Sequence, residues 1–397
     1  MEVATRGRLS CVTVGRGATV CHDGVAVRAI AFSRHGGHVA YPAQDGARWT
    51  IVRDGIPGAL WDGVGAPVLS ADGARLAFPA LSAGAWRVVV DGRVGEPFDE
   101  IIARSIAFSP GGESMAYAAR RGDSTQVVIN GVASAWWDGI GVVTFSKTGA
   151  HYAYAARRAA RVTLVVDGAV QPPHDAISEV AMSADGDRWA FAARDGDEWR
   201  VIERSASHGP YAAVRALAFR PGTGDLTFIA RVDDRERVVM GGVAQAEFRS
   251  VDAPAFDADG GTWGYVARDS GVAQVLKDGI VIARESWAAD LAIAPHGLRF
   301  AYVARRHDTL AVVDSHGTRY AFDVVVEGTL QFVGESWACL AGDRARKKLY
   351  VVVDGIGLAR RLDWEEVVRL MSAGEERDVL RAWVGAEVEL WQARPGR

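Results

Sequence analysis

The chain has 397 residues, of which 49% are hydrophobic and 24% are charged, and its formal net charge at pH 7 is -4. This composition is ordinary for a globular protein and gives no overall attraction to nucleic acid or to acidic membranes. The first residues lack a basic segment followed by an apolar run, and no stretch reaches the roughly 18 apolar residues of a membrane-spanning helix. We therefore expect a cytoplasmic protein without membrane contact.

The three cysteines, Cys11, Cys21 and Cys339, are too few and too scattered for a disulfide framework. Each lies in an apolar, strand-like stretch. We expect three free, buried thiols.

A motif of 37 residues recurs nine times, and its most regular step is a phenylalanine followed by a serine. The nine anchors are Ser33, Ser70, Ser109, Ser146, Ser183, Arg220, Asp257, Ala294 and Val333. Six of the eight intervals between them are 37 residues long, and the other two, Ser70 to Ser109 and Ala294 to Val333, are 39 residues long. Self-similarity at such a period is typical of propellers, solenoids and arrays.

One copy, residues 101–138, illustrates the elements that each repeat predicts. Residues 105–109 and 115–119 read as two strands joined by a Pro-Gly-Gly turn, and residues 126–129 read as a third strand. The dipeptide Asn130–Gly131 then predicts a tight primed turn into a short fourth strand.

Third strands such as residues 88–90 and 351–353 are continuous valine runs, which indicates apolar neighbours on both faces. Four-stranded antiparallel sheets packed face to face supply such neighbours and are the blades of a β-propeller. We predict an all-β propeller over residues 1–362, with nine complete blades from about residue 28 to 355; a solenoid is the alternative.

The motif also resembles a known family. The segments 108–112 (Phe-Ser-Pro-Gly-Gly), 69–73 (Leu-Ser-Ala-Asp-Gly) and 182–186 (Met-Ser-Ala-Asp-Gly) each precede a strand with an Ala-aromatic step and then a strand-turn segment of the Val-Val-x-Asp-Gly type. This pattern is similar to the TolB-type (Trp-Asp-repeat-like) propeller repeat of bacterial proteins. The resemblance implies the propeller fold and no single activity, because such blades occur both in scaffolds and beside hydrolase domains.

The two ends of the chain differ from the repeat. Residues 9–14 and 18–24 read as two strands of an incomplete blade, residues 363–384 as a short helical segment, and residues 385–397 as a possible closing strand. Joined together, the two ends would make a tenth blade. The helical segment would serve as a lid or as a second contact for a partner.

Two charged columns recur at the same offsets in neighbouring copies. The arginine column, after the second strand, comprises Arg120, Arg157, Arg194, Arg231, Arg268 and Arg305. The second column, after the fourth strand, comprises Asp62, Asp99, Asp138, Asp175, Ala212, Arg249 and Ser286. In propeller geometry the two columns open to the same face, so we expect exposed ion pairs such as Arg120 with Asp138 and Arg157 with Asp175.

In copies five to seven the arginine has no aspartate at the matching position. We therefore hypothesise that a sector made of Arg194, Arg231, Arg268 and Arg249 binds an acidic group, either carboxylates of a partner or phosphate.

An aromatic column precedes the aspartates and comprises Trp61, Phe98, Trp137, His174, Tyr211, Phe248 and Phe322. Packing between blades is its expected role, and a stacking platform for bases or sugars is the alternative.

The sequence has no nucleophile elbow, no phosphate-binding glycine loop and no zinc-protease motif. It therefore predicts no catalytic residue, no cofactor and no metal. We expect a non-catalytic scaffold that binds a protein partner within a bacterial, cytoplasmic complex. The alternatives are an enzyme or small-ligand binder that uses the central channel, and an anion or nucleic-acid binder that uses the arginine sector; the net negative charge argues against nucleic acid.

Overall fold

The computed structural model of the chain describes residues 2–6, 9–13, 19–34, 37–204, 206–307, 309–343, 348–363, 384, 385, 388 and 392. The chain divides into two compact units. Unit 1 comprises Met1–Asp197 and Val201–Ser207, and unit 2 comprises Glu198–Arg200 and His208–Arg397. We describe each unit by itself.

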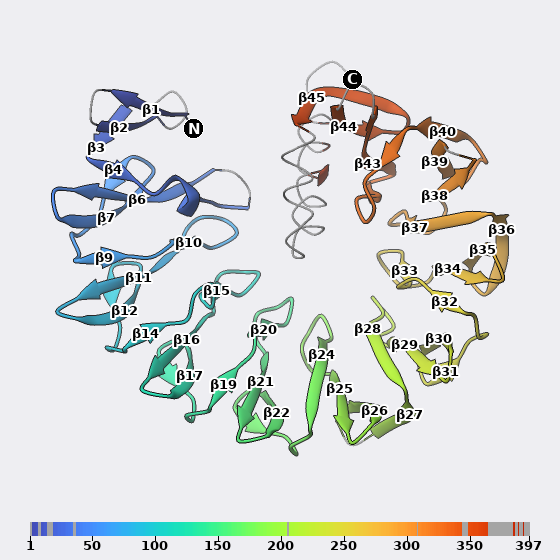
Figure 1. Ribbon diagram of the computed structural model, residues 1–397, viewed down its shortest axis with the longest axis horizontal. Coiled ribbons are helices and arrows are strands. Elements are labelled where there is room, and N and C mark those ends of the chain that lie inside the picture. Colours follow the sequence, from blue (N-terminus) through green and yellow to red (C-terminus); the bar gives the residue numbers. More distant parts are fainter. Residues whose placement is uncertain are drawn as a thin grey trace. The chain divides into compact units, whose positions relative to one another are not determined.

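The described residues form ten antiparallel sheets, nearly all built from strands that follow one another in the sequence (Figure 1). The first sheet has three strands. Each of the nine sheets that follow has the strand order first-second-third-fourth, and the first strand is often split into two short pieces that pair with the same second strand. This is the topology of β-propeller blades, and we number these sheets blades 1 to 9.

Unit 1 begins with the three-stranded sheet, whose strands are β1 (Glu2–Arg6), β2 (Leu9–Thr13) and β3 (Thr19–His22). Blade 1 consists of β4 (Gly24–Val25), β5 (Ala31–Phe32), β6 (Val39–Asp45), β7 (Arg48–Arg53) and β8 (Ile56–Pro57), with the 3-10 helix η1 (Val27–Ala29). Blade 2 consists of β9 (Gly63–Val64), β10 (Val68–Leu69), β11 (Leu76–Ser82), β12 (Ala85–Val90) and β13 (Arg93–Val94).

Blade 3 consists of β14 (Glu100–Ile101), β15 (Ala107–Phe108), β16 (Met115–Arg121), β17 (Ser124–Ile129) and β18 (Val132–Ala133). Blade 4 consists of β19 (Gly139–Ile140), β20 (Thr144–Phe145), β21 (Tyr152–Arg158), β22 (Arg161–Val166) and β23 (Ala169–Val170). Blade 5 consists of β24 (Ala176–Met182), β25 (Trp189–Asp195), β26 (Glu198–Glu203) and β27 (Ala206–Tyr211), and the division between the units falls within β26 and β27.

In unit 2, blade 6 consists of β28 (Ala213–Phe219), β29 (Leu226–Val232), β30 (Arg235–Met240) and β31 (Val243–Ala244). Blade 7 consists of β32 (Ser250–Val251), β33 (Ala255–Phe256), β34 (Trp263–Asp269), β35 (Val272–Lys277) and β36 (Ile280–Glu285). Blade 8 consists of β37 (Trp287–Ile293), β38 (Phe300–Arg306), β39 (Thr309–Asp314) and β40 (Arg319–Phe322). Blade 9 consists of β41 (Val324–Val325), β42 (Gln331–Val333), β43 (Ser336–Asp343), β44 (Lys348–Val353) and β45 (Ile356–Asp363).

The turn between third and fourth strands explains why one dipeptide type recurs at that position. Asn130 and Gly131 have φ values of 50° and 82°, the two positive values that a type I′ turn requires. The side chain of Asn130 also accepts a hydrogen bond from the backbone N–H of Met115 at 2.8 Å. The predicted primed turn is confirmed, and it joins the two outer strands while tying them back to the second strand.

The core lies between neighbouring blades. Val88 of blade 2 belongs to the same buried cluster as Ile101, Tyr117 and Val128 of blade 3. Burial of third-strand valines between adjacent sheets confirms the prediction drawn from their continuous apolar runs. Each blade therefore depends on its neighbours for most of its apolar burial.

The N-terminal sheet contains the two predicted strands, as β2 and β3, and also β1, which sequence analysis missed. The helical segment predicted for 363–384 and the closing strand predicted for 385–397 lie almost wholly outside the described residues. Of the described positions there, Asp363 is the last residue of strand β45, so the helical segment does not begin at this residue. Val384, Gly385, Val388 and Gln392 have helical backbone, so the extended conformation expected beyond residue 385 is not found at these positions.

Candidate functional site

The arginine column exists as a structural feature of each unit. Every member occupies the sixth position of a seven-residue second strand and lies opposite the first strand of its own blade. The members and their partners in register are Arg120 with Glu100, Arg157 with Gly139, Arg194 with Ala176, Arg231 with Ala213, Arg268 with Ser250 and Arg305 with Trp287.

The aspartate column has a different role from the predicted one. Each carboxylate accepts a hydrogen bond from a backbone N–H in the next loop between second and third strands, so it caps that loop. The pairs are Asp62 with Ala83 (3.1 Å), Asp99 with Gly122 (2.7 Å), Asp138 with Ala159 (2.6 Å) and Asp175 with Gly196 (2.8 Å). Asp23 caps Gly46 in the same way at 2.7 Å.

The predicted ion pairs of Arg120 with Asp138 and of Arg157 with Asp175 are therefore wrong. Arg120 pairs with Glu100, the residue directly opposite it in the sheet. Asp175 pairs instead with Arg161 at 2.5 Å. Register, which decides which side chains face one another across a sheet, overrides the similarity of offset on which the prediction relied.

The premise of the unpaired arginine sector is also wrong for two of its members. Arg231 donates to the carboxylate of Glu236 at 2.9 Å, and Arg268 makes two hydrogen bonds of 2.6 and 2.8 Å to Asp252. The hydrogen bonds to Asp252 raise the pKa of the Arg268 guanidinium above its usual value. The carboxylate partners come from positions outside the aspartate column, which is why the column did not reveal them.

The remaining arginines occupy varied settings. Arg194 lies in unit 1, whereas Arg231, Arg249 and Arg268 lie in unit 2, so the structure does not describe the four as one surface. Arg157 and Arg249 are exposed and, among the described residues, have no ion pair. The guanidinium of Arg305 lies 5.1 Å from the centroid of the Trp287 ring.

A buried charge cluster in unit 2 was not predicted. Glu236 is only 4% exposed, and its carboxylate accepts hydrogen bonds from Arg215 (2.6 Å), from Arg231 (2.9 Å) and from the backbone N–H of Val251 (3.2 Å). Arg215 also donates to the Val251 carbonyl at 2.5 Å, which links blade 6 to blade 7. Burial raises the pKa of Glu236, but the hydrogen bonds from the two arginines and from the Val251 N–H, together with the charge of Arg215, outweigh it and hold this pKa below its usual range.

A signal for this cluster was present in the sequence. Glu236 is the second residue of its third strand, and the same position in blades 1, 2 and 5 is Trp49, Trp86 and Trp199. The other blades have uncharged residues at this position, so Glu236 is its only charged residue, and a carboxylate that is buried there needs hydrogen-bonding partners.

The aromatic column packs between blades, as expected. Phe98 and Trp137 are 4% and 5% exposed, and Phe98 contacts Tyr117 edge to face with ring centroids 6.2 Å apart. His174 continues the column and is hydrogen-bonded to Asp195 at 2.7 Å, an interaction that lowers the pKa of that carboxyl. These rings are enclosed by protein and do not form an open stacking platform.

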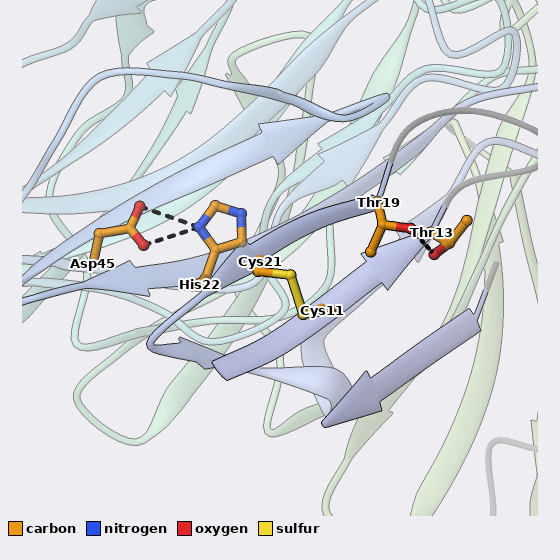
Figure 2. Close-up of a disulfide and its surroundings, with 6 residues drawn as sticks. All are labelled: Cys11, Thr13, Thr19, Cys21, His22 and Asp45. Atoms are coloured by element: carbon orange, nitrogen blue, oxygen red, sulfur yellow. Dashed lines mark hydrogen bonds and ion pairs between the residues drawn. A yellow bond between two sulfur atoms is a disulfide. The ribbon is translucent and has the colours of Figure 1, made fainter. Parts of the chain in front are cut away.

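The two cysteines of the N-terminal sheet are not free thiols, which differs from the prediction. Cys11 of β2 and Cys21 of β3 are direct partners in register and form a disulfide (Figure 2). The expected free thiols at these two positions are therefore wrong; Cys339 is free and buried, as predicted. Beside the disulfide, the Nδ1 atom of His22 lies 3.0 and 3.1 Å from the two carboxylate oxygens of Asp45.

A cavity of about 600 Å³ lies in unit 1 beside the first strand of blade 3. Its wall is mainly apolar and includes Trp86, Ile101 and Ile106, with Glu100 and Arg104 as its charged members. A cavity of this size and composition is within the usual range for small-molecule sites, about 300–1,000 Å³.

Two further features are absent from the part of the chain that the structure describes. No group of three or more histidine, cysteine, aspartate or glutamate side chains there is arranged to hold a metal ion. No described helix has both the length and the apolar character needed to cross a bilayer.

Neither a protein-family model nor a curated protein sequence matches the chain. Similar solved structures are propellers or contain them. The Dos1 propeller is 12% identical with a TM-score of 0.38, and the alignment covers 64% of this chain and 85% of that one. TolB from Acinetobacter baumannii is 13% identical with a TM-score of 0.29, covering 64% and 78%. The dihydro-heme d1 dehydrogenase NirN in complex with DHE is 14% identical with a TM-score of 0.34, covering 73% and 71%. The propeller assignment itself rests on the blade topology.

Proposed function

We propose that the chain is a non-catalytic β-propeller scaffold, built from TolB-type repeats, that binds a protein partner along the fourth strands of its blades. The observation that carries this proposal is a row of exposed aliphatic side chains directly after the third-to-fourth turns. In unit 1, Ile56 is 73% exposed and Val132 is 72% exposed. In unit 2, Val243 and Ile280 are 63% and 68% exposed.

These side chains are mostly exposed, so they contribute little to the buried core of the blades. Scattered exposed aliphatic residues are normal, but here an exposed valine or isoleucine recurs at one repeat offset in blades 1, 3, 6 and 7, whereas blades 2 and 4 have Arg93 and Ala169 there. Fourth strands such as β18 and β23 have only two residues. Such short edge strands leave space for a bound segment and limit nonspecific strand pairing with other chains.

Two grooves accompany the row in unit 1. One has a volume of about 500 Å³ and is lined by Val132, Val170 and Tyr154, among others. The second has a volume of about 610 Å³ and is lined by Val94 of blade 2 and Tyr117 of blade 3, together with the charged side chains Arg75, Asp91, Arg93 and Glu113. An extended partner segment that carries both apolar and charged side chains fits these two grooves.

The test is capture of partners by tagged protein from its host's lysate, with a high-salt wash and with matched variants. We expect a stoichiometric protein that is retained by wild type and lost from Val132→Asp, whose exposed position keeps the variant folded. The controls Arg157→Glu and Arg249→Glu change exposed residues of the opposite loops and should retain it. Loss from the arginine variants with retention by Val132→Asp would contradict the proposal and favour anion recognition.

The cytoplasmic location stays a prediction. The disulfide between Cys11 and Cys21 is typical of oxidising compartments, so the lysate should be prepared without reductant and with the cellular fractions kept separate.

A further inference from the structure

Blade 4 has histidines at two positions that contact the following blade. The first position is the residue directly before the second strand, and the second position is the aromatic column, in which His174 belongs to blade 4. In blades 1 to 8 the first position is occupied by His38, Arg75, Ser114, His151, Arg188, Asp225, Thr262 and Arg299. Among these described blades, only blade 4 has histidine at both positions. We call its contact with blade 5 the histidine joint.

His151 lies against the turn between the first and second strands of blade 5. Its Nδ1 atom is 2.7 Å from a carboxylate oxygen of Asp167 in its own blade, and its Nε2 atom is 3.8 Å from one of Asp187 in blade 5. The ring is so close to blade 5 that a Cβ atom on Gly186 would lie 2.5 Å from it. Asp185 of the same turn contributes a further negative charge. The imidazole therefore faces three carboxylates, two of which belong to blade 5.

His174 packs on the second strand of blade 5. Its ring centroid lies 5.7 Å from that of Phe191, and its Nδ1 atom is 2.7 Å from a carboxylate oxygen of Asp195. The side chain is only 12% exposed. Arg161 of blade 4 contacts the other oxygen of Asp195 at 3.1 Å and also pairs with Asp175. The second imidazole therefore faces one carboxylate of blade 5, which it shares with an arginine.

Neighbouring joints have groups at these positions that keep one charge state near neutral pH. Between blades 3 and 4, Trp137 contacts the guanidinium of Arg158, which lies 4.3 Å from the ring centroid. Arg75 of blade 2 holds Asp91 at 2.9 Å and donates to the Gly112 carbonyl of blade 3 at 2.9 Å. Arginine stays charged, whereas an imidazole changes its charge between about pH 5 and pH 8.

We propose that the histidine joint is a pH-sensitive contact, which is tightest when both imidazoles are protonated and loosens when they lose their protons. In the protonated state, the ion pairs of His151 with Asp187 and of His174 with Asp195 cross from blade 4 to blade 5. In the neutral state these attractions between charges are lost. The joint lies apart from the aliphatic row on the fourth strands, so it does not depend on the proposed protein partner.

The direction of the effect follows from the surroundings of His151. The hydrogen bond to Asp167, together with the charges of Asp167, Asp187 and Asp185, raises the pKa of His151 despite its partial burial. Its stabilisation is therefore complete below the ordinary histidine pKa of about 6.5 and is lost as the pH rises through the raised value. Because the side chain is 33% exposed, water screens its charge and the change is modest.

Hydrogen exchange of the full chain tests the proposal, with rates expressed as protection factors so that the intrinsic effect of pH is removed. The reporter is the Thr148 amide of blade 4, which donates to the Ala184 carbonyl of blade 5 at 3.2 Å. The reference is the Asn130 amide, which donates to the Met115 carbonyl within blade 3 at 2.9 Å. Between about pH 5 and pH 8, Thr148 protection should fall roughly threefold to tenfold, as expected from two partly exposed ion pairs. Asn130 protection should stay constant.

The variants replace each histidine by a residue that the same position has in other blades. His151→Arg introduces the permanently charged residue of blades 2, 5 and 8, and His174→Phe introduces the ring found at Phe98. Each single variant should reduce the pH dependence of Thr148 protection, and the double variant should abolish it. The matched control is His38→Arg at the contact between blades 1 and 2, where His38 lies 2.8 Å from Asp54. It should leave the pH dependence at Thr148 unchanged.

Thr148 protection that stays constant or rises between the two pH values in the wild type would overturn the proposal, whether or not the variants fold. A pH dependence that survives in the double variant, or that disappears in His38→Arg, would overturn it as well.

Discussion

The charge cluster around Glu236 gives an asymmetric prediction about stability. The carboxylate is 5% exposed, whereas the side chains of Arg215 and Arg231 are 43% and 51% exposed. Removal of an arginine leaves a buried carboxylate with fewer partners, but removal of the carboxylate leaves two arginines that water can solvate. Arg215→Met should therefore destabilise blade 6 more than Glu236→Leu does.

The magnitudes follow from that difference in burial. Breaking a buried ion pair typically costs about 3–5 kcal/mol; because Arg231 and the Val251 N–H remain, Arg215→Met should cost about 2–3 kcal/mol. Glu236→Leu should cost about 1 kcal/mol, the net value of a hydrogen bond. The double variant should lie within about 1 kcal/mol of wild type, since well-packed apolar replacements of buried ion pairs are often neutral.

Native-state hydrogen exchange suits this measurement, because blades can open locally and the exchange of one amide reports on the opening of its own blade. The Val251 amide, which donates to Glu236 at 3.2 Å, is the reporter. Additive costs in the double variant, or a larger cost for Glu236→Leu than for Arg215→Met, would refute the reasoning.

The same cluster predicts a pH dependence. The pKa of Glu236 is lowered in the folded chain, so its contribution to stability is complete above the ordinary glutamate pKa of about 4.3 and is lost as the pH falls through the lowered value. Protection of the Val251 amide should decline in that acidic range for wild type and change less for Glu236→Gln.

Three further predictions concern single positions. Asp99→Ala removes the cap on Gly122 and should lower the unfolding free energy by about 0.5–1.5 kcal/mol, whereas Asp99→Asn, which keeps an acceptor oxygen, should lose less; urea titration distinguishes them. Reduction of the Cys11–Cys21 disulfide, which closes a ten-residue separation, should weaken protection of β2 and β3 by about 2–3 kcal/mol without affecting blade 4 of the same unit, as read by hydrogen exchange before and after a mild reductant. Gly149→Ala should be more destabilising than Gly122→Ala, because both glycines have positive φ but only at Gly149 would a Cβ atom lie 2.8 Å from a neighbouring side chain; equal melting temperatures would contradict this.

Features set by local sequence were predictable, and those set by register were not. The Asn130–Gly131 turn follows from two residues whose conformational preferences are strong, and the blades follow from repetition of such turns. The Arg120 partner could not be identified from offsets alone, because Glu100 faces it only in the register that the two strands adopt.

The Cys11–Cys21 disulfide could not be predicted for the same reason, because it depends on strand register. Cys11 and Cys21 face one another because β2 and β3 pair symmetrically about residue 16, with Thr13 opposite Thr19. Scattered spacing argued against a bridge, but two cysteines equally distant from the midpoint of two paired strands are direct neighbours across them. The register of β2 and β3, not the number of cysteines, therefore determines the bridge.

In a repeat protein, a residue that departs from its column is informative, and its surroundings decide what the departure means. Glu236 stands where three other blades have tryptophan and the remaining blades have uncharged residues. Its carboxylate is enclosed and accepts hydrogen bonds from two arginines and a backbone N–H, and Arg215 also donates to the Val251 carbonyl, so this charge is used inside the protein to join blade 6 to blade 7. We therefore expect Glu236→Leu to change stability and to leave partner binding at the exposed fourth strands unchanged, whereas Val132→Asp should do the reverse. Comparison of the two variants by hydrogen exchange and by partner capture tests both expectations on one protein.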